Sequence, residues 1–144
     1  MIWFLRHGDA EDQAQDDASR RLTERGEHQS RTAGRALAAL GAKVDVCLTS
    51  PKARALDTAR LACRELGVDV EETPGLRGGD FDPEALVSGR GDVLLVGHEP
   101  DFSRAIQATT GAHVKLKKGG VAAVEDGTLI TLLRPTELRA IAGS

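Results

Sequence analysis

The sequence predicts an α/β fold: one domain over residues 1–144, built as a three-layer α/β/α sandwich whose central sheet is mostly parallel. Three short apolar runs of strand length lie at residues 2–5, 44–48 and 93–96. Each run is followed by a segment with helical periodicity, which is typical of β-α-β units and a parallel sheet. Two later apolar runs flank Asp126 and Gly127, a pair that favours a type I′ turn, so we expect the sheet to end in an antiparallel C-terminal hairpin.

The first expected helix follows the first strand after a polar loop. It begins near Thr23, whose side chain is suited to cap a helix, and it runs to Leu40. Gly41 then provides the stop. The apolar positions of this segment fall on one helical face and comprise Ala33, Ala36, Leu37 and Leu40.

The second and third expected helices each start at a proline. Ser50 is suited to the N-cap and Pro51 to the first helical position of the second helix, which ends before Gly67. Pro100 takes the first helical position of the third helix, which ends before Gly111. The expected buried positions are Leu56, Ala59, Cys63 and Leu66 in the second helix and Phe102, Ala105, Ile106 and Thr109 in the third.

Turn-forming residues predict loops at residues 9–21, 73–83 and 117–120. Within the second loop, the segment DFDPE at residues 80–84 predicts a turn and the start of a short helix. Cys47 and Cys63 lie inside apolar segments, so we expect two reduced core thiols and no disulfide.

The composition excludes several classes of partner. The formal net charge is −3, and three Phe, one Trp and no Tyr leave few rings for stacking bases, so nucleic-acid binding is not expected. No apolar run approaches the roughly 20 residues that span a bilayer, and the N-terminus MIWFLRHG lacks the pattern of a secretory signal. We therefore expect a cytoplasmic protein that does not bind membranes.

Basic and imidazole side chains follow each of the three predicted strands. The strand exits carry Arg6, His7 and Gly8, then Ser50, Pro51 and Arg54, and finally Gly97, His98 and Glu99. Because the carboxyl ends of parallel strands share one edge of a sheet, we expect two arginines and two histidines to meet there. Such a set suits a phosphoryl group, with planar cationic forks and imidazole nitrogens around its oxygens. No carboxylate or cysteine pairs with these histidines at metal-ligand spacing, so neither a metal nor another cofactor is expected.

Three motifs in this order, LRHG, TSPKAR and VGHEP, resemble those of the histidine phosphatase superfamily, also called the phosphoglycerate mutase-like or RHG family. The small size, the start RHGDAE and the segment RRLTERGEHQSRTAGRAL are most similar to bacterial SixA-type phosphohistidine phosphatases, and the resemblance covers residues 1 to about 134. It implies that His7 is the nucleophile and becomes transiently phosphorylated. It also implies that Arg6, Arg54 and His98 bind the phosphoryl group, and Gly8 leaves room for a close approach.

The proton donor is left open by the sequence. Family members that act on phosphate esters often use an acidic donor, but here residues 67–91 form a short connection, so Glu99 and Asp9 are the nearby candidates. Glu99 is equally suited to cap the helix that starts at Pro100. A phosphohistidine releases an imidazole, whose conjugate acid has a pKa near 6.5, and needs little acid assistance.

Three functions therefore remain in order of preference. The first is hydrolysis of phosphohistidine on a signalling or phosphotransfer protein, the second is hydrolysis of a small phosphate ester, and the third is binding of a phosphorylated partner without turnover. An acidic run beside the site comprises Asp9, Glu11, Asp12, Asp16 and Asp17. This run is either a solvated loop or a surface that repels polyanions and attracts a basic partner. The oligomeric state is not indicated.

Overall fold

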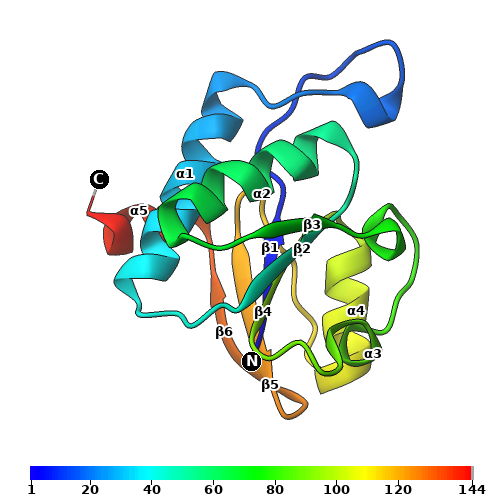
Figure 1. Cartoon of the computed structure of the whole chain (residues 1–144), viewed down its shortest axis with the longest axis vertical. Helices are drawn as coiled ribbons and strands as arrows, with labels where there is room; N and C mark the ends of the chain where they lie inside the picture. Colours follow the sequence, from blue (N-terminus) through cyan, green and yellow to red (C-terminus); the bar gives the residue numbers. More distant parts are fainter. Residues whose placement is uncertain (144) are drawn as a thin grey trace.

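A six-stranded mixed sheet runs through the protein, in a computed structural model that describes residues 1–143 (Figure 1). The strands are β1 (Ile2–Arg6), β2 (Val46–Thr49), β3 (Val70–Glu72), β4 (Val93–Gly97), β5 (Val121–Glu125) and β6 (Thr128–Leu133). Their order across the sheet is β3-β2-β4-β1-β5-β6. The first four of these are mutually parallel, whereas β5 pairs antiparallel with both β1 and β6. The expected parallel sheet with an antiparallel end is confirmed.

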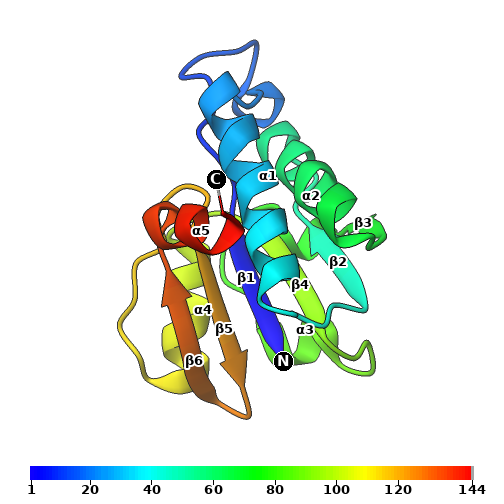
Figure 2. The same cartoon turned by 90° about the vertical axis from the view of Figure 1, so that its left-hand side faces the viewer.

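Helices cover both faces of the sheet, as the predicted sandwich requires (Figure 2). One face carries α1 (Glu24–Ala39), α2 (Ala53–Leu66) and α5 (Pro135–Ala142), and the other carries α3 (Pro83–Val87) and α4 (Asp101–Thr110). Two single turns of 3₁₀-helix, η1 (Asp17–Ser19) and η2 (Pro74–Leu76), lie in the expected loops. Within the described part of the chain, no helix has the length and apolar character needed to cross a membrane.

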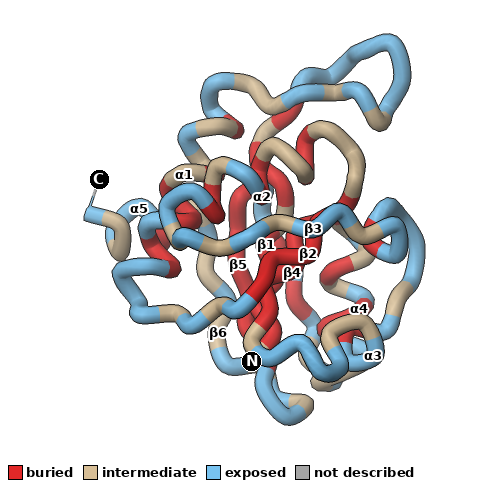
Figure 3. Tube along the Cα trace, in the orientation of Figure 1, coloured by how far each residue is buried: buried red, intermediate tan, exposed pale blue. Residues whose placement is uncertain are grey.

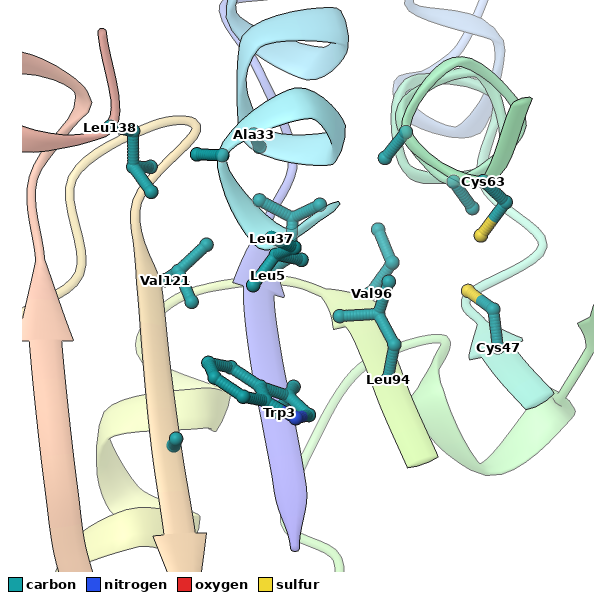
Figure 4. Close-up of a cluster of buried hydrophobic side chains, with 14 of the residues drawn as sticks. Trp3, Leu5, Ala33, Leu37, Cys47, Cys63, Leu94, Val96, Val121 and Leu138 are labelled. Atoms are coloured by element: carbon teal, nitrogen blue, oxygen red, sulfur yellow. The ribbon is translucent and has the colours of Figure 1, made fainter. Parts of the chain in front are cut away.

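Alternate residues of each central strand serve two separate cores, because successive side chains of a strand point to opposite faces. Trp3 and Leu5 pack toward α1, α2 and α5, whereas Phe4 packs edge-on against Phe102 of α4. Figure 3 shows the resulting buried centre along β1 and β4, and Figure 4 shows the first of the two cores. The sulfur atoms of Cys47 and Cys63 face each other in that core, and both thiols are free, as expected.

The first helix and the hairpin agree with their sequence signals. The Thr23 side chain accepts a hydrogen bond from the amide of Gly26 at 3.1 Å, and α1 ends one residue before its C-cap, Leu40. Asp126 and Gly127 have φ values of 49° and 71°, which the type I′ turn requires at both central positions. The short helix α3 begins where DFDPE predicts it, with the Asp82 carboxylate accepting from the amides of the first turn.

The starts of α2 and α4 differ from the prediction. Ser50 does not cap α2, and Pro51 is not its first residue; the N-cap is Lys52, without a side-chain bond. The hydroxyl of Ser50 instead bonds to the His98 ring, so the chain bends through two more residues before the helix begins. Pro100 is the N-cap of α4 rather than its first residue.

The prediction for one further strand has the wrong bounds, and two elements were not predicted. The second strand spans Val46–Thr49 instead of residues 44–48, and the sequence signals did not indicate β3 or α5.

Candidate active site

The three strands β1, β4 and β2 end side by side and place the predicted residues at one edge of the sheet. Arg6 is in register with Gly97, and the amide of His7 donates to the Gly97 carbonyl at 3.0 Å. The amide of Ser50 donates to the carbonyl of the residue that precedes Gly97, also at 3.0 Å. As a result the rings of His7 and His98 lie with centroids 5.3 Å apart. The expected meeting of these residues at one edge of the sheet is therefore observed in the structure.

His7 is a buried, neutral imidazole with a defined tautomer. Its Nδ1 lies 2.7 Å from the Gly8 carbonyl oxygen, and because a carbonyl only accepts, Nδ1 carries the proton and Nε2 carries the lone pair. The pKa of His7 is lowered to about 4, mainly by burial and also by the positive charges of Arg54, Arg6 and Lys118, while the Gly8 bond acts in the opposite direction. At neutral pH the Nε2 lone pair is thus free to attack an electrophile.

His98 faces His7 and is also neutral. Its Nε2 lies 2.8 Å from the Ser50 hydroxyl, which in turn accepts the amide of Lys52 at 3.2 Å. With the hydroxyl proton donated to Nε2, the tautomer of His98 carries its own proton on Nδ1. The pKa of this ring is lowered to about 3, mainly by burial and also by the neighbouring His7 and Arg54.

The two arginines are held by backbone carbonyls, which leaves part of each guanidinium unused. Arg6 Nη1 donates to the Leu116 carbonyl at 2.9 Å. Arg54 Nη1 and Nη2 donate to the carbonyl and carboxylate oxygens of Asp17 at 2.8 and 3.2 Å. The Nε atoms of both arginines and Nδ1 of His98 are buried without a hydrogen-bond partner, and within residues 1–143 only two other side-chain atoms share that condition. These three nitrogens are unsatisfied within the described residues, and an unsatisfied buried polar atom is costly.

Gly8 is required by packing. A Cβ atom on Gly8 would lie 2.5 Å from the carbonyl oxygen of Gly26 in α1, and a Cβ on Gly26 would overlap the Asp9 carbonyl. The Gly8 amide donates to the Thr58 hydroxyl at 3.1 Å, and this hydroxyl donates to the Arg54 carbonyl at 2.7 Å. The paired glycines thus seat the start of α1 against the exit of β1, next to His7.

Both candidate proton donors are occupied as hydrogen-bond acceptors. The Glu99 carboxylate accepts the Ser103 amide at 2.7 Å, the Leu116 amide at 3.2 Å and also the Ser103 hydroxyl. Since Ser103 is the third residue of α4, this geometry matches the capping interpretation of Glu99. The Asp9 carboxylate accepts from Thr23 and Lys118, and these bonds, the Thr23 bond first, hold the pKa of Asp9 below its usual range.

Comparisons with known proteins identify the family. The family model of the histidine phosphatase superfamily, branch 1, matches residues 2–85. An uncharacterized protein of Picosynechococcus sp. is 37% identical over 142 residues, which cover 88% of this chain and 85% of that protein. This chain belongs to the histidine phosphatase superfamily.

Solved structures of phosphatases share this fold over nearly the whole chain. The protein histidine phosphatase SixA complexed with tungstate superposes with a TM-score of 0.81 at 24% identity, covering 95% of this chain and 98% of that one. The α-ribazole phosphatase from Shigella flexneri superposes with a TM-score of 0.69 at 18% identity, covering 92% and 95%. At these identities the likeness shows a common architecture.

The sequence did not predict the contacts of two side chains beside this candidate site. Ser50 was interpreted as a helix cap, but it bonds to His98. Asp17 was interpreted only as part of the acidic run, but its carboxylate bonds to Lys52 Nζ at 3.1 Å and to Arg54, and these bonds, the Lys52 bond first, hold its pKa well below the usual range. The loop position of Asp17 gave no signal for this pairing. Within residues 1–143, no three histidine, cysteine, aspartate or glutamate side chains are grouped as a metal site requires.

Proposed function

We propose that this histidine phosphatase hydrolyses phosphohistidine on a protein, through a covalent phosphate on His7. One observation supports this choice of substrate. Both nearby carboxylates, Glu99 and Asp9, already accept hydrogen bonds from other groups of the protein. An alkyl ester leaves as an alkoxide, which is comparable to hydroxide from water with a pKa of about 15.7, and it needs a proton donor. A phosphohistidine ring that is protonated on its second nitrogen releases a neutral imidazole, whose conjugate-acid pKa is near 6.5, and it needs no further proton donor.

The first step transfers the phosphoryl group to the enzyme. The substrate ring carries a proton on the nitrogen that does not hold the phosphoryl group. His7 Nε2 forms a bond to phosphorus while the substrate's phosphorus–nitrogen bond breaks, and the electron pair of that bond stays on the substrate ring, which departs as neutral imidazole. The Nε atoms of Arg6 and Arg54 and Nδ1–H of His98 donate to the phosphoryl oxygens, where the negative charge lies. The Gly8 carbonyl stabilises the positive charge that forms on the His7 ring.

The second step releases phosphate. Water attacks phosphorus, the bond to Nε2 breaks, and its electron pair returns to His7. One water proton leaves to solvent, and the other stays on the released phosphate. The lowered pKa of His7 favours this step, because the neutral imidazole is a good leaving group in this buried position.

Space beside the site supports a macromolecular substrate. A cavity of about 650 Å³ lies next to Asp17 and Lys52 and is bordered on its far side by Arg77 and Gly78. The connection between α2 and β4 consists of β3, η2 and α3 and adds no further domain over the site. SixA, which shares this fold, is named a protein histidine phosphatase, and its structure holds tungstate, a tetrahedral oxyanion like phosphate.

The alternative is a phosphatase for small phosphate esters, which the likeness to an α-ribazole phosphatase supports. For that reaction, Glu99 has to give up its bonds to Ser103 or Asp9 its bond to Lys118 before either donates a proton.

Side-by-side kinetics decide between the two functions. We expect kcat/KM for a phosphohistidine peptide to exceed that for glycerol 2-phosphate by at least about 10²-fold, the lower end of what a general acid contributes. His7→Ala serves as the control and is expected to lose turnover of both substrates and to form no phosphoenzyme in rapid-quench experiments. Faster turnover of the alkyl ester refutes the proposed substrate, and full activity of folded His7→Ala protein refutes the nucleophile. EDTA is expected to leave turnover unchanged.

A further inference from the structure

A second cavity, of about 520 Å³, lies on the other side of the site from Asp17. We name it the basic groove, because six cationic side chains line it: Arg6, Arg25, Lys117, Lys118, Arg134 and Arg139. Asp9 is the single carboxylate in the lining. The groove thus gathers six of the nineteen lysines and arginines of a chain whose net charge is −3.

Three of these cations have no counter-ion within the part of the chain that the structure describes. Lys118 pairs with Asp9 and Arg134 with Glu137. Arg25, Lys117 and Arg139 are exposed, and none of them has an ion pair in residues 1–143. At least half of the cations in the groove are therefore free to meet an outside anion.

Helix stability does not explain why one of these three cations, Arg25, is where it is. Arg25 is the second residue of α1, where a cation opposes the positive end of the helix dipole. Lys117 lies in the turn before β5, and Arg139 lies in α5. The three residues therefore come from three separate segments of the chain, which the fold brings together at this groove.

The basic groove is continuous with the phosphoryl site. Arg6 lines the groove and has its Nε in the cluster with Arg54 and His98. The charge of Lys118 also reaches His7 and contributes to lowering the pKa of that ring. A molecule that presents a phosphoryl group to His7 therefore extends along the groove when it continues past Arg6.

We propose that the basic groove binds an acidic segment of the phosphoprotein substrate, next to its phosphohistidine; this inference rests on the proposed function. The six cations come from four parts of the chain and line one groove beside a single carboxylate, which suits several carboxylates in a row. A single small anion would need them converged at one point. The lining holds no aromatic ring, as a groove for single-stranded nucleic acid requires for base stacking.

A charge-reversal pair of variants tests the groove. The groove variant is Arg25→Glu/Lys117→Glu/Arg139→Glu. The matched control reverses three exposed cations that line neither the groove nor the site, as Lys43→Glu/Arg60→Glu/Arg104→Glu. Both changes alter the net charge equally, so a general repulsion affects both proteins alike. The neutral variant Arg25→Gln/Lys117→Gln/Arg139→Gln replaces the groove variant if the latter does not fold.

Two measurements use matched peptides. The first is the anisotropy of a fluorescein-labelled, unphosphorylated peptide with six glutamates, against its six-glutamine counterpart, at low salt. The second is the ratio of kcat/KM for the same two sequences carrying one phosphohistidine. For the unmodified protein we expect both measures to favour the glutamate peptide at least about tenfold, or about 1.4 kcal/mol. We expect a preference below about twofold in the groove variant and an intact preference in the control.

The outcomes separate the groove from the proposed function. Equal turnover of both phosphopeptides by the unmodified protein overturns the groove and leaves the phosphohistidine activity standing. Selective binding of the glutamate peptide without turnover of either phosphopeptide supports the groove and refutes the activity. An equal loss in the control variant, or tighter binding of an oligothymidylate than of the glutamate peptide, overturns the inference.

Discussion

Acidification from pH 7 to pH 5 is expected to destabilise the fold by about 4 kcal/mol through two buried histidines. His7 and His98 are only 7% and 6% exposed, and their pKa values are lowered to about 4 and about 3, mainly by burial. In the unfolded chain each ring takes up a proton near its ordinary pKa of 6.5. Between pH 6.5 and the folded pKa values, the unfolded state binds more protons, so the free energy of unfolding falls as the pH falls.

The magnitude follows from the pKa differences. At pH 5 an unfolded histidine is about 1.5 pH units below its pKa, whereas both folded rings are still neutral, and each unit corresponds to about 1.36 kcal/mol. Each histidine therefore contributes about 2 kcal/mol, a large part of a typical stability of about 5–15 kcal/mol. The lowered pKa values of Asp9 and Asp17 do not enter in this window. Stability from a carboxylate is lost only as the pH falls below its unfolded value, near 3.9.

Urea unfolding at pH 7, 6 and 5 measures the effect. The unmodified protein is compared with His98→Asn and with the double variant His7→Gln/His98→Asn, whose side chains do not titrate. We expect losses of about 4, 2 and 0 kcal/mol, respectively, over this range. A double variant that loses as much stability as the unmodified protein refutes the reasoning, because the acid sensitivity then comes from other groups.

Three substitutions test the remaining contacts. Arg54→Lys is expected to lower kcat/KM by about 10²- to 10³-fold in steady-state assays, because one ammonium cannot replace the bonds to Asp17 and also donate from the Nε position; unchanged kinetics would remove Arg54 from the site. Gly26→Ala is expected to cost about 1–3 kcal/mol in urea unfolding, since its Cβ overlaps a backbone carbonyl. Gly78→Ala, whose Cβ meets nothing within 4 Å, is its neutral control. Glu99→Gln is expected to lower turnover of phosphohistidine and alkyl ester alike by less than about tenfold, as loss of a cap does; a selective collapse on the ester would restore the proton-donor role.

The parts of the fold that the sequence predicted are those with strong local signals. The strands β1 and β4 are buried on both faces and therefore appear as unbroken apolar runs. By contrast, β3 is an edge strand with one apolar residue, Val70, followed by two exposed glutamates. In α5 only Leu138 is buried, and this helix depends on packing against α1 rather than on a periodic pattern of its own.

The candidate site shows the same difference between features with a local sequence signal and features that depend on tertiary contacts. Arg6, His7, Arg54 and His98 could be grouped in advance, because parallel strands end at one edge and the order of the motifs placed each residue at an exit. The hydrogen-bond partners of these four residues could not be predicted in advance. The Ser50 hydroxyl has two competing uses, as a cap or as a bond to a ring 48 residues away, and only the tertiary arrangement decides between them.

The cluster of Arg6, His7, Arg54 and His98 destabilises the folded state for the same physical reason that we expect it to bind a phosphoryl group. Two neutral imidazoles and the Arg54 guanidinium are buried together beside the half-buried Arg6, and the carboxylate that bonds to the Arg54 guanidinium, Asp17, is half exposed on a loop. Nitrogens without partners and rings that resist protonation make the empty site unfavourable. A dianion that accepts from those nitrogens relieves the first penalty, and by its charge it makes protonation of His7 or His98 less costly. We therefore expect a phosphoryl substrate to bind where the resting protein is least satisfied, at the edge of the sheet where β1, β2 and β4 end.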